Sequence, residues 1–399
     1  MKLLEGFDRD LRLLTLSLGL RRIVMGFFQV VRAIYLALLG FSPIEIGLLL
    51  SLATFVSAIH SVTFGLLSDR FGRRPFLLLG NCFAVLRMIL FAISTDFWVL
   101  ALGQGVGALG EGVGAGQPVV SGYITDKVKS EKRAPVFTTI AITNSIAATL
   151  GSLMAGFPVY LQESLRLSVV DAHSLLFWAS AVTTLASLLI VMQVKEVKPA
   201  EADTHNAKPS LVHITSWGMI GRFTLVRSTS GLGWGFIDSL LPLYFFLRFD
   251  IGSDILGPIY ALTRFFSIFS YLLIPRVVER FGNITPIIVS RVLTAVLATA
   301  FAFTSWYELA IVLLTVLRTG ILFTMPIRQT FATRLVAPSE IATAIGISNF
   351  VRMSLRTLAP TLAGYMFEAV SLSLPFLSGA GLFAVNAVLY HTLFSQDKT

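Results

Sequence analysis

The chain has 399 residues, of which 55% are hydrophobic and only 13% are charged. In soluble globular proteins about a quarter of all residues are charged. This composition therefore excludes an ordinary soluble domain and indicates a polytopic membrane protein. The net charge of +9 is also typical of nucleic-acid-binding proteins. Here, however, the basic residues lie in short links beside apolar stretches, as they do in cytoplasmic membrane loops. We therefore expect a lipid bilayer around the chain and no nucleic-acid partner. The single cysteine, Cys82, excludes a disulfide and a cysteine-rich metal site, and we expect no cofactor.

The apolar stretches predict twelve transmembrane helices, because a helix needs about 20 mostly apolar residues to cross a bilayer. They lie near 13–38, 43–67, 75–94, 97–122, 136–160, 172–194, 215–247, 252–276, 284–304, 307–333, 341–367 and 373–394. One long polar segment interrupts the series after the sixth helix. We therefore expect an all-α protein with an N-terminal six-helix bundle over 1–194, a cytoplasmic linker over 195–214 and a C-terminal six-helix bundle over 215–399.

The orientation follows from Lys and Arg in the links, since short cytoplasmic loops are enriched in both. The links after the even-numbered helices hold Arg70, Arg73, Arg74, Lys127, Lys129, Lys132, Arg133, Lys195, Lys198, Lys208, Arg276, Arg280 and Arg334. Those after the odd-numbered helices hold only Arg166 and Arg248. Both termini and the linker are therefore expected in the cytoplasm, and the expected location is the plasma membrane.

The two halves repeat one another in sequence. Asp69-Arg70-Phe71-Gly72 aligns with Glu279-Arg280-Phe281-Gly282 at an offset of 210, which also aligns Gly47 with Gly257. An offset of 208 aligns Gly156 with Gly364. Two six-helix halves of the same orientation predict a parallel repeat about an axis along the membrane normal.

The link after the second helix, Gly65-Leu66-Leu67-Ser68-Asp69-Arg70-Phe71-Gly72-Arg73-Arg74, resembles the signature of the major facilitator superfamily at every fixed position. The resemblance implies two bundles that rock about a central site to give alternating access. It also implies a gating role for Asp69, through contact with the start of the eleventh helix near Pro338-Ser339-Glu340. The gating residues expected on this basis are Gly65, Asp69, Arg70, Gly72, Arg73 and Arg74, with Glu279 and Arg280 in the second half.

Two further patterns of this family fit less closely. Gln104-Gly105-Val106-Gly107-Ala108 matches a pattern of the fourth helix, but Ala101 stands where the family has an arginine linked to proton coupling. Gly151-Ser152-Leu153-Met154-Ala155-Gly156 resembles the signature of antiporters without its proline. It is a weak signal for export.

Ionisable residues inside membrane spans cost several kcal/mol and are candidates for function. Glu111, Arg264, Arg318 and Arg356 are expected near the middle of their spans, Asp238 and Arg32 nearer the outer half, and Arg352 nearer the inner third. These residues, Arg352 apart, are the predicted substrate or proton sites. For Arg21, Arg22, Arg227 and Arg291, which lie closer to cytoplasmic ends, we expect snorkelling toward the lipid headgroups.

Glu111 and Arg318 occupy nearly equivalent depths in the two halves. They could form a structural ion pair, or Glu111 could be a proton site whose pKa is raised by desolvation and lowered by a nearby arginine. The surplus of arginine points to an anionic or strongly polar substrate, because arginine grips carboxylates and phosphates bidentately.

The function that these features favour is secondary active transport of a small organic solute by alternating access, with proton-coupled export. The alternative is an organic-anion or phosphate-ester exchanger or symporter that uses the intramembrane arginines. A nutrient sensor and a lipid scramblase are more distant alternatives. No nucleophile–base arrangement or metal pair indicates an enzyme. We expect a monomer with a small-molecule substrate, an anionic one under the alternative, and protons as the coupling ion.

Overall fold

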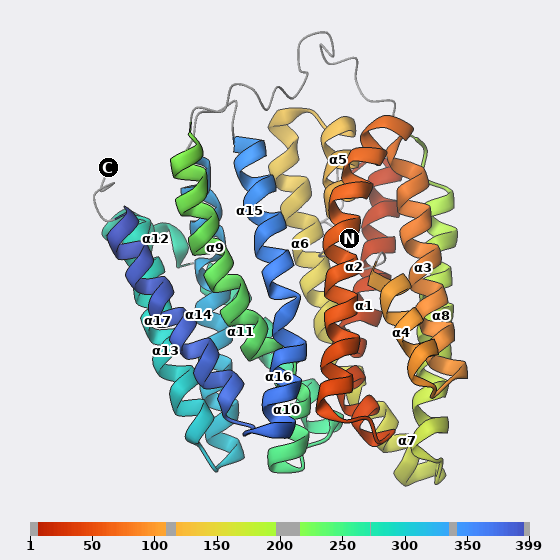
Figure 1. Ribbon diagram of the computed structural model, residues 1–399. Coiled ribbons are helices and arrows are strands. Elements are labelled where there is room, and N and C mark those ends of the chain that lie inside the picture. The colour runs from red at the N-terminus through yellow and green to blue at the C-terminus, as the bar shows by residue number, and fades with distance from the viewer. Residues whose placement is uncertain (1–6, 109–116, 197–215, 272, 335–340, 395–399) are drawn as a thin grey trace. The chain divides into compact units, whose positions relative to one another are not determined.

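The computed structural model describes residues 7–108, 117–196, 216–271, 273–334 and 341–394. All regular secondary structure in these ranges is helical, which confirms the predicted all-α class (Figure 1). The elements are α1 (Arg9–Leu38), α2 (Pro43–Phe71), α3 (Arg73–Ile93), α4 (Phe97–Gly107), α5 (Gln117–Lys127), α6 (Ser130–Leu153), the 3₁₀ turn η3 (Met154–Gly156), α7 (Phe157–Leu165), α8 (Val169–Met192), α9 (Trp217–Asp238), α10 (Leu241–Phe249), α11 (Ser253–Tyr271), α12 (Ile274–Phe281), α13 (Ile284–Phe303), α14 (Tyr307–Arg334), α15 (Ile341–Arg356), α16 (Leu358–Ala369) and α17 (Leu374–Phe394).

Nine helical stretches in the described ranges are long and apolar enough to cross a membrane. They match nine of the twelve predicted spans, and some combine consecutive elements, such as Pro135–Leu165 and Trp217–Phe249. The other three predicted spans correspond to α4 with α5, to α11, and to α15 with α16. The structure is therefore consistent with twelve spans.

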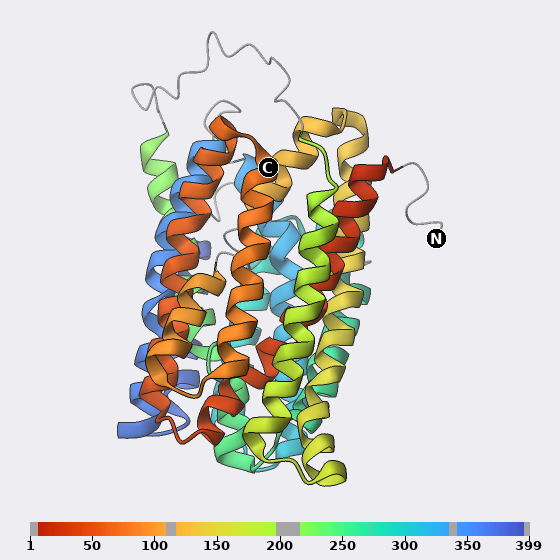
Figure 2. The ribbon, with the colours of Figure 1, turned by 90° about the vertical axis from the view of Figure 1, so that its right-hand side faces the viewer.

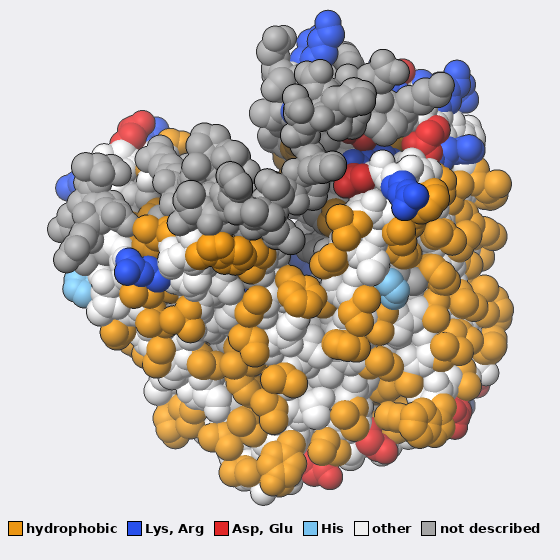
Figure 3. All heavy atoms as spheres, turned by 45° about the horizontal axis from the view of Figure 1, so that its top comes forward, with side chains coloured by type: hydrophobic (Ala, Val, Ile, Leu, Met, Phe, Trp, Pro, Cys, Tyr) orange, Lys and Arg blue, Asp and Glu red, His pale blue; other side chains and the backbone are white. Residues whose placement is uncertain are grey.

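The outward faces of these helices are apolar. Large hydrophobic side chains are exposed on most of them, among them Val182 at 65%, Phe303 at 68% and Val388 at 60%. Figure 3 shows hydrophobic side chains over the sides of the helices and Lys and Arg side chains gathered toward the end drawn uppermost. A helix surface of this kind is suited to lipid, because a bilayer offers no hydrogen bonds to polar groups.

The chain forms two compact units. The first comprises Met1–Gly40, Leu52–Lys208 and Ile251–Ala261, and the second comprises Phe41–Ser51, Pro209–Asp250 and Leu262–Thr399. The first turns of α2 thus belong to the second unit, and the first turns of α11 to the first. The boundaries proposed from the sequence, at 194 and 215, stay a prediction.

Glycines explain these two exchanged segments. In the second unit, a Cβ atom on Gly47 would lie 2.4 Å from the carbonyl oxygen of Pro360, and one on Gly364 2.3 Å from that of Pro43. In the first unit, a Cβ atom on Gly257 would lie 2.3 Å from the carbonyl oxygen of Ser152. Small residues let membrane helices approach this closely. Gly47 and Gly257, aligned by the sequence repeat, thus make equivalent contacts.

In the first unit, α3 lies beside α8 (Figures 1 and 2) and α1 packs against α6. The α1–α6 contact is again close, since a Cβ atom on Gly151 would lie 1.9 Å from the carbonyl oxygen of Ile23. In the second unit, α9 packs against α15 and α17, and α13 packs against α14 and α17. This arrangement positions the polar residues described next.

Candidate anion-binding site

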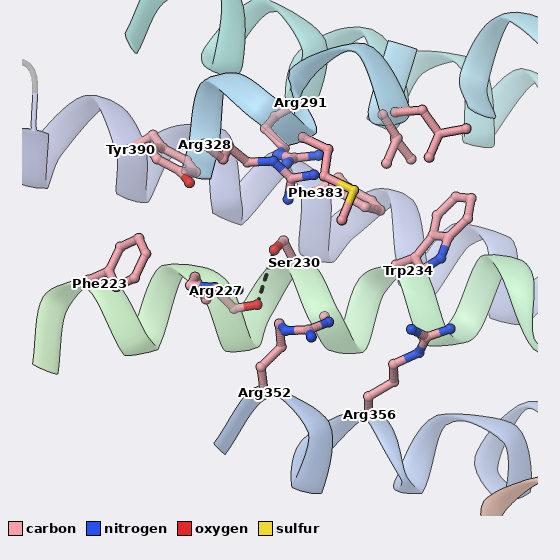
Figure 4. A pocket seen from close by; sticks show the side chains of 14 residues that line it. Phe223, Arg227, Ser230, Trp234, Arg291, Arg328, Arg352, Arg356, Phe383 and Tyr390 are labelled. Atoms are coloured by element: carbon pink, nitrogen blue, oxygen red, sulfur yellow. Dashed lines mark hydrogen bonds between the residues drawn. The ribbon is translucent and has the colours of Figure 1, made fainter. Parts of the chain in front are cut away.

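Five arginines of the second unit line one pocket of about 210 Å³ (Figure 4). We call this cavity the arginine pocket. No Asp or Glu is among the described residues that line it, which are Phe223, Arg227, Ser230, Gly231, Trp234, Arg291, Ile321, Leu322, Met325, Arg328, Arg352, Arg356, Phe383 and Tyr390. They come from α9, α13, α14, α15 and α17. The pocket therefore combines strong positive charge with an apolar and aromatic wall.

Helical spacing brings several of these residues to the pocket. Arg227, Gly231 and Trp234 are three and four residues apart on α9, so they lie on one face of the helix. Arg352 and Arg356 are one turn apart on α15. Gly231 is required by the close approach of the two helices, because a Cβ atom there would lie 2.5 Å from Cγ of Arg352.

Polar neighbours orient two of the guanidinium groups. Arg227 donates to Oδ1 of Asn349 at 2.7 Å and to Oγ of Ser348 at 3.3 Å. Arg352 reaches the same Asn349 oxygen at 3.5 Å. One amide side chain thus holds two arginines on the α9–α15 side of the pocket.

Arg328 and Arg291 lie on the opposite side of the pocket, with their guanidinium groups next to one another (Figure 4). Nε of Arg328 donates to the carbonyl oxygen of Thr324 at 3.3 Å. Arg291 is 0% exposed, and its guanidinium carbon lies 5.2 Å from the centre of the Phe383 ring. Within the described part of the chain, none of its three side-chain nitrogens has a hydrogen-bond partner.

A buried ion pair adjoins the arginine pocket. Oδ1 of Asp238 lies 2.9 Å from a terminal nitrogen of Arg318, and both side chains are 11% exposed. The other carboxylate oxygen lies 3.9 Å from Arg356, which also lines the pocket. The guanidinium of Arg318 stands 5.8 Å from the centre of the Trp234 ring. Asp238 thus holds two arginines at the Trp234 end of the pocket.

The structure brings together three of the site residues predicted from the sequence, Asp238, Arg318 and Arg356. Arg264, on α11, is half-buried and does not line the pocket. Arg32 lies in the first unit, where it donates to Oε1 of Gln104 at 3.1 Å and stands 5.3 Å from the Phe28 ring centre. Glu111 lies outside the described residues, so its pairing with Arg318 stays a prediction.

The prediction of snorkelling is wrong for Arg291, which is buried inside the second unit, and for Arg21, which is 7% exposed. Arg227 also points into the pocket, and Arg328 was not predicted at all. A signal for Arg291 was present in the sequence. Ser290, Arg291 and Thr294 share one face of an otherwise apolar helix, and that face is the buried one.

The predicted gating residues form a network in the first unit. Arg73 forms ion pairs with Asp69, one turn before it, and with Asp126 of α5, and it donates to Ser68 at 2.8 Å. Its guanidinium packs against Gly122, where a Cβ atom would lie only 2.3 Å from Cζ. The predicted contact of Asp69 with Pro338-Ser339-Glu340 falls outside the described residues.

The Glu196 carboxylate completes this network. It accepts from the backbone N–H groups of Arg73 at 2.9 Å and Arg74 at 3.0 Å, at the N-terminus of α3. Gly72 precedes that helix with a φ of 95°, a conformation that favours glycine. Arg74 also donates to the carbonyl oxygen of Met192 at 2.6 Å.

Of the remaining gating residues, Gly65 is half-buried and the others are exposed. Gly65, on α2, packs against Pro118, since a Cβ atom on Gly65 would lie 3.5 Å from Cβ of Pro118. Arg70 lies over the Phe71 ring, with 5.6 Å to its centre. Glu279 and Arg280 are exposed on α12, and Arg280 lies over Phe281 at 5.3 Å in the same way. The two aligned Arg-Phe pairs therefore share a local geometry.

Comparison with known proteins shows similarity to one family. A family model described as Major Facilitator Superfamily matches residues 14–360. The class B tetracycline resistance protein of Escherichia coli is 24% identical over 263 residues, which cover 64% of this chain and 62% of that protein. The chain thus matches less than two thirds of that relative's length.

The uncharacterized membrane protein YJR124C of Saccharomyces cerevisiae is 20% identical over 396 residues, covering 90% of this chain and 88% of that protein. Among solved structures, a bacterial homologue of the human lysosomal transporter Spinster, in an inward-facing and occupied conformation, is similar with a TM-score of 0.77. It is 16% identical and covers 98% of both chains. This likeness shows a shared fold.

Proposed function

This chain belongs to the Major Facilitator Superfamily, and we propose that it is a secondary transporter whose substrate is a small organic anion. The observation that supports this proposal is the arginine pocket, with five arginines and no acid among its described lining residues. Arginine keeps its charge and forms paired hydrogen bonds with carboxylates and phosphates. Buried charges need a partner, so these arginines favour a substrate that supplies negative charge.

The buried ion pair extends this proposal to the transport cycle. Asp238 competes with an anionic substrate for Arg318 and Arg356, because its carboxylate oxygens lie 2.9 Å from Arg318 and 3.9 Å from Arg356. Protonation of Asp238 would release both arginines to the substrate. Proton coupling through Asp238 and Glu111 therefore remains our proposal for the energy source, since an intramembrane acid is a natural proton carrier.

A ligand screen tests the substrate class. Binding raises the apparent stability of a folded protein by mass action, so the thermal midpoint of the purified protein is measured with anionic metabolites and lipophilic cations side by side. We expect the stabilising compounds to be anions and Arg356→Met to weaken their effect. Arg248→Met is the matched control, since Arg248 lies outside the pocket and donates to the carbonyl oxygen of Thr304. Hits confined to lipophilic cations would refute an anionic substrate.

Flux measurements test the coupling. The best hit is loaded into proteoliposomes with and without a pH gradient, and uphill movement is followed for the wild type, Glu111→Gln and Asp238→Asn. We expect one or both variants to lose pH-driven accumulation while keeping downhill exchange. Undiminished accumulation in both variants would exclude proton coupling through these acids.

A second candidate function is drug export. It is supported by the relative from Escherichia coli that is named a tetracycline resistance protein, and by the partial export signature at Gly151–Gly156. The same screen separates the two candidates, because export of uncharged or cationic compounds needs no arginine. Expression in a drug-sensitive strain would then raise resistance, and Arg356→Met would leave that resistance intact.

The expected setting is the plasma membrane, with both termini in the cytoplasm and one chain as the functional unit. The asymmetry of Lys and Arg supports this orientation. Labelling of single cysteines introduced at each terminus, in a Cys82→Ser background, tests it in intact cells. Labelling by an impermeant reagent before lysis would contradict it.

A further inference from the structure

The arginine pocket contains a buried cation that has no ion-pair partner among the described residues. Arg291 is 0% exposed, and among the described residues its Nε and both terminal nitrogens lack a hydrogen-bond partner. Its contact with the Phe383 ring, 5.2 Å from the ring centre, is a cation–π interaction. Such a contact stabilises a desolvated cation, but it does not replace the hydration that an ion loses on leaving water.

The other arginines increase this imbalance. Arg328 lies beside Arg291, and Arg227 and Arg352 approach from the facing helices (Figure 4). Nε of Arg352 also lacks a hydrogen-bond partner among the described residues, while Arg227 is held in place by Asn349. The only acid described near the pocket is Asp238, which is engaged with Arg318 and Arg356 at the other end. Several like charges are thus held close together at a site of low dielectric.

We propose that the end of the arginine pocket formed by Arg227, Arg291, Arg328 and Arg352 binds a doubly charged oxyanion group of the phosphate type. This inference rests on the proposed function and names the substrate class. A carboxylate has one charge and two oxygens, and one arginine fork satisfies it. A phosphate monoester carries nearly two charges at neutral pH and has three acceptor oxygens, so it can bridge several arginines.

The size and lining of the pocket fit a compact monoester. Its volume of about 210 Å³ lies below the range of roughly 300–1,000 Å³ typical of drug-sized ligands. In Figure 4, Trp234 and Arg356 lie away from the Arg291 end. The carbon part of the ester would extend toward Trp234, in a pocket whose apolar lining includes Ile321 and Met325. A phosphate group alone, a small soluble ester and the headgroup of an acidic phospholipid share this chemistry.

The binding test uses the purified full-length protein and two probes, inorganic phosphate and ethyl phosphate. Thermal midpoints are measured at pH 7.5 against chloride, acetate and succinate at matched ionic strength. We expect saturable stabilisation by both phosphate compounds and at least tenfold weaker affinity for acetate and succinate. Equal stabilisation by chloride and phosphate, or tighter binding of succinate, would overturn the proposal.

Arg291→Met locates the site. Replacement of a buried ion pair by well-packed apolar side chains is often neutral or stabilising. Arg291→Met removes a buried charge and leaves no described hydrogen-bond partner behind, so this variant is expected to fold. We expect its affinity for ethyl phosphate to fall at least tenfold, with Arg328→Met as a second variant and Arg248→Met as the unaffected control. Full affinity in both pocket variants would place phosphate elsewhere and contradict the inference.

The pH dependence tests the double charge. The second pKa of a phosphate monoester is about 6, whereas arginine stays protonated. The affinity for ethyl phosphate should therefore fall several-fold between pH 7.5 and pH 5. A constant affinity over this range would mean that a single negative charge suffices and would overturn the assignment to a dianion.

Two further measurements identify the source of the phosphate and separate this inference from the proposed function. In nanodiscs, displacement of bound ethyl phosphate by phosphatidic acid but not by phosphatidylcholine would identify the ligand as a lipid headgroup. If neither lipid displaces ethyl phosphate, the ligand is a soluble ester. Either result supports binding of a phosphate group at this site. Anion flux without Arg291-dependent phosphate binding would refute the inference and leave the proposed function intact. Phosphate binding without any anion flux would support the site and refute organic-anion transport.

Discussion

Asp238→Asn should destabilise the second unit by about 3–5 kcal/mol, because it removes the carboxylate that is paired with the buried Arg318. The carboxylate and guanidinium are 2.9 Å apart, and both side chains are 11% exposed. With an effective dielectric constant of about 20, their attraction is about 6 kcal/mol before desolvation is counted. Arg356, at 3.9 Å, adds a weaker interaction with the same carboxylate.

A double-mutant cycle measures this coupling. Unfolding is followed by tryptophan fluorescence during a denaturant titration in mixed micelles for the wild type, Asp238→Asn, Arg318→Met and the double variant. The double variant should recover at least about 2 kcal/mol relative to the sum of the single losses, since both partners of the ion pair are then removed together. Asp250→Asn, which removes an exposed acid of the same unit, is the control and should change little. Additivity within about 0.5 kcal/mol would refute the ion pair as a stabilising contact.

Three further predictions concern stability. Gly364→Ala should cost about 1–3 kcal/mol by overpacking, since its Cβ atom would lie 2.3 Å from the carbonyl oxygen of Pro43. Gly381→Ala is the control, because no atom lies within 4 Å of the new Cβ, and its effect on stability should be neutral or favourable. Equal thermal midpoints for the two variants would contradict the close contact at Gly364. Glu196→Ala should cost roughly 1 kcal/mol by uncapping α3, whereas an equal loss in the exposed Glu163→Ala control would argue against capping. Finally, the hydrogen bond from Lys127 lowers the pKa of Asp8 below 3.8, so this carboxylate contributes stability that is present above about pH 4 and lost as the pH falls through its lowered pKa. Asp8→Asn should flatten that acid limb of the thermal-midpoint profile, and an unchanged limb would exclude the contribution.

Much of the fold could be predicted from the sequence. Hydropathy and length gave the spans, because the backbone of a membrane segment must satisfy its own hydrogen bonds and therefore forms a helix. The repeat that aligns Gly47 with Gly257 also predicted equivalent positions, and both glycines make close helix contacts in the structure. The Gly65–Arg74 signature correctly indicated the family, and Asp238, Arg318 and Arg356 were recognised as candidates from their depth in the membrane.

The tertiary structure decided which arginines meet. Depth along a helix can be computed from the rise of 1.5 Å per residue, but the direction of a side chain around the helix axis depends on the neighbouring helices. On helices that are apolar on most sides, the hydrophobic pattern gives little indication of the buried face. Arg291 was therefore expected to reach the headgroups, yet its helix is rotated so that it points into the second unit with Ser290 and Thr294.

The sequence by itself determined that this protein crosses the membrane many times, repeats in two halves and belongs to a transporter family. Only the structure shows that Arg227, Arg291, Arg328 and Arg352, which come from four different helices, line one small pocket. The physical reason is that membrane insertion depends on each segment's own residues, whereas the binding site depends on contacts between segments. Hydrophobic burial in lipid acts on each segment separately, whereas a binding site depends on helix rotation and packing, which many residues determine together.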